Sequence, residues 1–128
     1  MSAQDYRRIG EAFSLLENAL LDILCSGADT GSSNARAQRA TATWGGYEHD
    51  GCECFLISVA PADGAPTIEH DGGPLAMAEV ADGAETLGLL ELWVVDGRLH
   101  SVNYMPFGDE HVALPAPEEY TITLIDSE

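Results

Sequence analysis

The dipeptide Asp96-Gly97 constrains this chain more than any other feature, because it separates two runs of strand-forming residues within positions 87–105. A type I′ turn requires positive φ at both central residues, which aspartate tolerates and glycine adopts freely. Asp-Gly between apolar runs is therefore among the strongest local signals for a β-hairpin. We expect residues 87–105 to form the central hairpin of a sheet.

The first strand of this hairpin carries apolar side chains on both of its faces. Alternation along a strand places Leu90 and Leu92 on one face and Glu91 and Trp93 on the other. Neither set is wholly polar. We therefore expect both faces of the sheet to be partly covered.

The second strand of the hairpin breaks this alternation. Leu99 is out of phase with Val102 and Tyr104. One extra residue near His100-Ser101 would bring all three onto a common face. We expect a β-bulge at this point.

Residues 1–25 are predicted to form one long amphipathic helix. Ser2 is a suitable N-cap, and Gly27 is suited to the left-handed conformation that follows a last helical turn. Apolar residues recur at helical spacing at Ile9, Phe13, Leu16, Leu20 and Leu24. A stripe of this kind normally packs on the protein's own sheet.

The rest of the chain predicts a sheet. Residues 26–35 hold turn formers and no apolar anchor, which indicates a flexible connection, although Ala35–Ala40 could extend as a short helix. Residues 40–125 should supply five or six mainly antiparallel strands. Besides the two strands of the hairpin, we expect strands at 40–44, 52–60, 75–82 and 121–125. A turn is expected at Gly45-Gly46, after the first of them. The predicted fold is a single α+β domain over residues 1–128, with the long N-terminal helix packed on one face of a curved sheet.

Acidic residues are distributed unevenly along the chain. Residues 1–39 hold five acids and four arginines, whereas residues 40–128 hold seventeen acids and one arginine, Arg98. The formal charges of the two parts are therefore −1 and −16, which make up the total of −17. Such a field repels nucleic acid and anionic lipid and speeds encounter with a basic partner. The simpler interpretation is that the acids keep the protein soluble.

The chain shows no signal for export or for a membrane span. Its apolar runs are far shorter than the roughly 20 residues that a transmembrane helix requires. Acids at Glu11, Glu17 and Asp22 interrupt the N-terminal stripe, unlike the apolar stretch of a signal peptide. We expect a cytoplasmic protein with reduced cysteines.

A metal site is the first chemical possibility. Cys52 and Cys54 share one face of a predicted strand, with His49 just upstream. These are too few ligands for zinc unless Cys25, His70 or an acid completes them, and no second paired motif is present. We therefore expect buried structural thiols, with no metal and no cofactor.

Catalytic motifs are not evident. Acids surround Cys52 and Cys54 and would raise the thiol pKa, which disfavours a nucleophilic thiolate. The four histidines lie in acidic stretches, and pairs such as His70-Asp71 arise easily by chance in so acidic a chain. The carboxylates lack the ordered spacing of an EF-hand loop. We expect a protein that is not an enzyme.

The stretch LELWVVDGRLHSVNYMPFGDEHVALPAPEEY resembles a recurrent C-terminal pattern of small bacterial proteins: a hydrophobic strand, DGRL, an aromatic, then GDE and a proline-rich end. Some of these proteins resemble immunity proteins of polymorphic toxin systems. The upstream GCECFLISV is similar to a strand that accompanies the pattern, so the resemblance spans about residues 51–120. Asn103 stands where an acid is commoner in that pattern. The resemblance implies an α+β fold and carries over no catalytic residue.

These observations favour a non-enzymatic acidic binding module, an immunity or antitoxin-like protein that neutralises a basic partner protein. Its expected contacts lie in glycine- and proline-containing loops after the central hairpin, at Asp109, Glu110, Glu118 and Glu119. The main alternative is a small metal-binding or accessory protein that uses the strand of Cys52 and Cys54. An enzyme whose pocket leaves no mark in the sequence is a third possibility.

Overall fold

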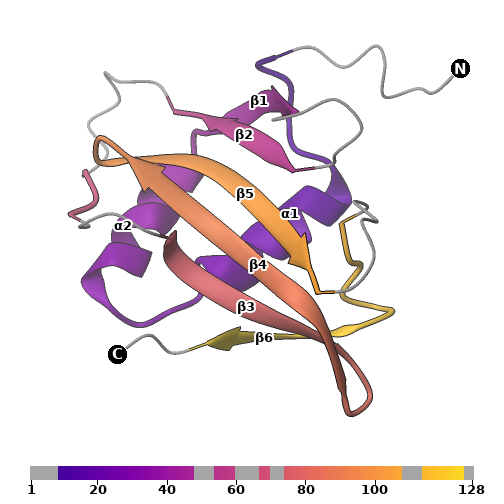
Figure 1. Ribbon diagram of the computed structural model, residues 1–128. Coiled ribbons are helices and arrows are strands. Elements are labelled where there is room, and N and C mark those ends of the chain that lie inside the picture. Colours follow the sequence, from indigo (N-terminus) through magenta and orange to yellow (C-terminus); the bar gives the residue numbers. More distant parts are fainter. Residues whose placement is uncertain (1–8, 48–53, 60–66, 70–73, 108–113, 126–128) are drawn as a thin grey trace, which may run out of the picture.

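The structure, a computed structural model, describes residues 9–47, 54–59, 67–69, 74–107 and 114–125. Two helices precede six strands (Figure 1). In chain order the elements are α1 (Leu15–Leu24), α2 (Thr30–Arg39), β1 (Thr43–Tyr47), β2 (Phe55–Ser58), β3 (Pro74–Asp82), β4 (Glu85–Val95), β5 (Arg98–Pro106) and β6 (Thr121–Ile125).

The strands form one open antiparallel sheet in the order β1-β2-β5-β4-β3-β6. Helix α1 contacts β3 and β6, and α2 contacts β5 and β3. Both helices lie behind the sheet in Figure 1, so they cover the same face of it. The predicted α+β class is confirmed, and the sheet, for which five or six mainly antiparallel strands were expected, has six in the described residues.

The central hairpin forms as the sequence predicts. Asp96 has φ 55° and Gly97 has φ 80°, and Val95 pairs with Arg98 across the two-residue turn. Positive φ at both central residues is the requirement of a type I′ turn. The turn joins β4 and β5, which are the two central strands of the sheet.

The predicted bulge in the second strand is also confirmed. Val94 pairs with Leu99 and Trp93 pairs with Ser101, so His100 is the extra residue on β5. As a result Leu99 joins Val102 on the face that packs against the helices, where both side chains are buried.

The prediction of one long N-terminal helix is wrong. Helix α1 begins at Leu15, because Ser14 is its N-cap and forms a capping box: the Ser14 Oγ accepts from the Glu17 N–H, and the Glu17 Oε1 accepts from the Ser14 N–H. Before it, Gly10 has φ 103° and its N–H donates to the Trp44 carbonyl at 2.8 Å. Residues 9–11 therefore run beside β1, and the first eight residues lie outside the described parts.

The predicted flexible connection at 26–35 is wrong in its second half, because Thr30 to Ala35 belong to α2. Asp29 is the N-cap of this helix and accepts from the Ser32 N–H at 3.2 Å. Gly27 is not among the glycines with positive φ, contrary to the prediction. It is required for space instead, since a Cβ there would lie 2.6 Å from the Ser32 Oγ.

The other strands differ from the prediction mainly in their ends. Strand β1 continues through Gly45-Gly46, where a turn was expected. A Cβ at Gly45 would lie 3.0 Å from the Leu56 backbone, so glycine permits close approach of β1 and β2. Strand β6 has the predicted bounds, and β3 begins one residue before its predicted start. Positions 52, 53 and 60 of the second predicted strand lie outside the described residues.

The core lies between the helices and the sheet face that they cover. Its fully buried members include Leu20, Leu21 and Leu24 of α1, Phe55 of β2, Ala78 and Val80 of β3, Leu90 and Leu92 of β4, and Val102 of β5. Burial of apolar area of this kind is the main favourable contribution to folding. The face opposite the helices is free to carry other residue types.

A buried glutamine ties α2 to the central hairpin. The Gln38 Nε2 donates to the Gly97 carbonyl at 2.9 Å, and the Leu99 N–H donates to the Gln38 Oε1 at 2.9 Å. The Gly97 carbonyl also accepts from the Ile68 N–H at 2.8 Å. The two bonds of Gln38 fix the turn against α2, and the Ile68 bond ties the same turn to residues 67–69.

Candidate functional site

Two of the four acids predicted to contact a partner are described, and they lie side by side. Glu118 and Glu119 are exposed in the turn that leads into β6, where the Glu119 N–H donates to the Ala116 carbonyl at 3.0 Å. Asp109 and Glu110 lie outside the described residues. The turn is anchored by Leu114, which is buried in the core, so its two carboxylates extend from a fixed base.

Strand register brings a second acidic turn to the same end of the sheet. Thr121, the first residue of β6, pairs with Ala81, so the Glu118-Glu119 turn lies beside the end of β3. There Asp82 pairs with Glu85 across the β3–β4 turn. The four exposed acids Asp82, Glu85, Glu118 and Glu119 are called here the acidic end of the sheet.

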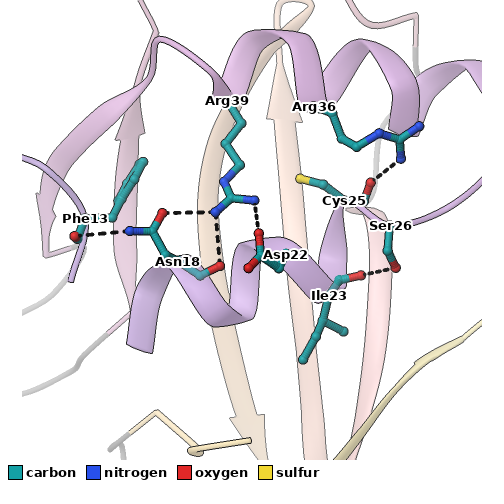
Figure 2. A network of polar contacts seen from close by, with 8 residues as sticks. All are labelled: Phe13, Asn18, Asp22, Ile23, Cys25, Ser26, Arg36 and Arg39. Atoms are coloured by element: carbon teal, nitrogen blue, oxygen red, sulfur yellow. Dashed lines mark hydrogen bonds and ion pairs between the residues drawn. The ribbon is translucent and has the colours of Figure 1, made fainter. Parts of the chain in front are cut away.

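Two arginines of α2 hold the two helices together (Figure 2). Arg39 forms an ion pair with Asp22 and donates to the Asn18 carbonyl and side chain at 3.2 and 3.0 Å. Arg36 donates to the Cys25 and Gly27 carbonyls at 2.6 and 2.8 Å, which satisfies the C-terminal end of α1. Both side chains therefore serve structural roles.

The sheet face that neither described helix covers is called here the open face, and it is the second candidate surface. In register, Met77 pairs with Glu91, and Leu89 pairs with both Glu79 and Met105. Because side chains alternate along a strand, these residues point away from the buried Leu90 and Leu92. The open face includes Met77, Glu79, Leu89, Glu91, Trp93, Asn103 and Met105.

Carboxylates on the open face are held by neighbouring side chains. The Trp93 Nε1 donates to the Glu91 Oε1 at 3.0 Å, and the Thr86 Oγ1 donates to the Glu79 Oε2 at 2.6 Å. Glu91 is only 9% exposed although neither described helix covers it. Hydrogen bonds of this kind orient a carboxylate and compensate part of the cost of burying it.

The cysteines are described in part. Cys54 is buried and its sulfur accepts from the Tyr104 N–H at 3.3 Å; His49 and Cys52 lie outside the described residues. Burial raises the pKa of the Cys25 thiol to about 11, which keeps it protonated at neutral pH. Within the described parts of the chain, no three His, Cys, Asp or Glu side chains gather to hold a metal ion.

Sequence reasoning did not nominate Glu91, Trp93, Asp82 or Glu85 as site residues. Glu91 and Trp93 were placed on a common face, and a glutamate between apolar strand residues was a visible signal. Asp82 and Glu85 become part of a site only through the pairing of β3 with β6, two strands that are about 40 residues apart in the chain. No local pattern reports such a long-range pairing.

Comparisons with models of protein families, with curated proteins and with solved structures find no match for this chain. In the described residues, neither helix has the length and apolar character needed to cross a bilayer.

Proposed function

We propose that this protein is a non-enzymatic, cytoplasmic binding module that neutralises a basic partner protein, in the manner of an immunity or antitoxin-like protein. The observation that carries this proposal is the acidic end. Four exposed carboxylates, from two turns far apart in sequence, lie at one end of a sheet anchored by a continuous core. Binding of this kind requires a rigid charged surface and no chemical step.

The charge of the whole chain supports the same proposal. A net charge of −17 attracts a basic protein from a distance and repels nucleic acid and anionic membranes. Charge complementarity acts chiefly on the rate of encounter and on the choice of partner.

The test begins with basic proteins encoded beside the gene for this chain. Each is purified, and its association with the immobilised protein is measured by surface kinetics at low and physiological salt. We expect a partner whose association slows steeply with salt, because exposed charges farther apart than about 8 Å are screened at 0.15 M. Dissociation should change much less.

Reversing the charge of two carboxylates tests whether the acidic end is where the partner binds. Glu118→Lys with Glu119→Lys should slow association by about tenfold at low salt. The matched control is Glu11→Lys with Glu69→Lys, which changes the net charge equally at exposed positions elsewhere. If both pairs of substitutions slowed association equally, the acidic end would contribute only through the net charge of the protein and would not be the contact. If no partner bound in a salt-dependent way, the proposed function would be refuted.

A further inference from the structure

The open face carries several apolar side chains at positions where a solvated sheet face is usually polar. Here Met77, Leu89, Trp93 and Met105 lie on it, and Met105 is 45% exposed. Tryptophan and methionine are enriched in protein interfaces, where methionine adapts to the shape of a partner. Apolar surface bordered by polar groups indicates a protein-binding site.

Glu91 lies in the middle of this apolar surface. Met77 and Asn103 are its neighbours across the sheet, and Leu89 and Trp93 are its neighbours on the same face of β4. A carboxylate accepts up to about four hydrogen bonds, and in the described residues Trp93 donates one of them. Because the side chain is nine-tenths buried, water screens its charge poorly. A cation brought to this position would be attracted strongly.

We propose that the open face docks the partner protein, and that an arginine of the partner binds the carboxylate of Glu91 and stacks on the indole of Trp93. This inference rests on the proposed function and names the docking surface for it. Arginine fits better than lysine, because its planar guanidinium pairs with carboxylates, stacks on aromatic rings and is less strongly hydrated. A second copy of this chain fits poorly, since each copy carries a charge of −17.

The acidic end complements this docking surface. Asp82 and Glu85 terminate the same strands, β3 and β4, that carry Met77, Glu79 and Glu91 on the open face. A partner would therefore meet exposed acids that guide its approach and then an apolar surface with one buried carboxylate at its centre. This division between a charged rim and an apolar centre is the usual anatomy of a protein interface.

The chain offers an internal control for testing this contact. It contains two tryptophans, Trp93 on the open face and Trp44 buried on the covered face, so the ¹⁵N-labelled protein gives two indole N–H signals. The probe is the peptide acetyl-Gly-Leu-Arg-Leu-Gly-amide. The matched control peptide carries citrulline, the uncharged analogue of arginine, in its place. Trp93→Phe identifies which signal belongs to Trp93.

We expect the arginine peptide to shift the Trp93 signal saturably, with a dissociation constant of about 1 mM, and to leave the Trp44 signal unmoved. The citrulline peptide should bind at least about fivefold more weakly. Glu91→Gln should weaken the arginine peptide by about fivefold, whereas Glu118→Gln, which removes the same charge at the acidic end, should change it by less than about twofold. An unmoved Trp44 signal reports that the Glu91 variant is folded.

Three outcomes would overturn the inference: no saturable shift of the Trp93 signal at several millimolar peptide, equal binding of the citrulline peptide, or equal weakening by the two charge variants.

The same measurements separate this inference from the proposed function. Salt-dependent binding of a basic protein without any effect of the peptide on Trp93 would leave the function standing and reject the docking surface. The reverse pattern would retain the surface and reject the neutralising function.

Discussion

The covered and open faces of the sheet are built from alternate residues of the same strands, yet they serve different purposes. On the covered face, Leu90 and Leu92 are fully buried beneath the helices. On the open face, Glu91 and Trp93 share a hydrogen bond, and Met105 is nearly half exposed. The comparison teaches that the stability of this protein is concentrated on one face, which leaves the other free to carry charge and apolar surface for binding.

The largest expected effect tests this division directly. Leu92→Ala should lower the free energy of unfolding by about 2 to 5 kcal/mol, because it removes a fully buried side chain and leaves a cavity. Met105→Ala, on the open face, should cost less than about 1 kcal/mol. Urea unfolding measures both. Comparable losses would mean that the open face is as important for stability as the covered one.

The hairpin turn at the end of β4 and β5 is the next test. Gly97→Val should cost about 1 to 3 kcal/mol, because a β-branched residue is strained at φ 80° and its Cβ would lie 3.2 Å from the Thr67 Cβ. Gly83→Val is a useful control, since φ is 64° there but a Cβ would meet nothing within 4 Å. Thermal melting should therefore show a larger shift for the Gly97 variant, and an unchanged midpoint would contradict the type I′ turn.

The hydrogen bonds between Gln38 of α2 and the hairpin test how much buried polar contacts add to the stability of the covered face. Gln38→Met keeps the size of the side chain but removes the acceptor of the Leu99 N–H, so it should cost about 2 kcal/mol. Asn34→Ala removes an exposed hydrogen bond to the Thr67 carbonyl from the same helix and should cost less. Chemical denaturation compares the two variants, and an equal cost would show that burial of the Gln38 bonds adds nothing.

The smallest effect concerns the N-cap of α2 and depends on pH. The hydrogen bond from the Ser32 hydroxyl holds the pKa of Asp29 below its ordinary value of 3.8. The carboxylate therefore stabilises the fold above about pH 4, and this contribution is lost as the pH falls through the lowered pKa. Asp29→Ala should cost about 1 kcal/mol at pH 7. Melting at several pH values should show the difference from wild type shrinking in acid; a constant difference would contradict the shifted pKa.

Local signals predicted well where neighbouring residues decide the outcome. The Asp96-Gly97 turn and the bulge at His100 depend on the backbone preferences of a few residues and on the phase of Leu99 against Val102, so both were found from the sequence. The start of α1 also had a local signal, because Ser14 and Glu17 are spaced as in a capping box. This signal was overlooked because apolar residues at helical spacing extend back to Ile9. In the structure Ile9 is largely exposed and does not continue the buried stripe of α1.

The first half of helix α2 was missed for a different reason, although Ala35–Ala40 had been offered as a possible short helix. Its sequence is polar and rich in turn formers, so its apolar periodicity is weak. The helix is held by contacts with distant residues: Arg39 with Asp22, Arg36 with the end of α1, and Gln38 with the hairpin. Tertiary contacts can stabilise a helix that local propensity would leave marginal, and they are invisible before the fold is known.

The sequence by itself determined the turn, the bulge, the alternation along each strand and the excess of acid, because each depends on residue type and near neighbours. Only the tertiary structure decided which face of β4 the helices cover, since Leu90 with Leu92 and Glu91 with Trp93 both offered a partly apolar face. It also decided that Asp82 lies at the same end of the sheet as Glu118, through the pairing of β3 with β6. Both outcomes follow from long-range packing, which depends on where the helices dock and not on any local pattern.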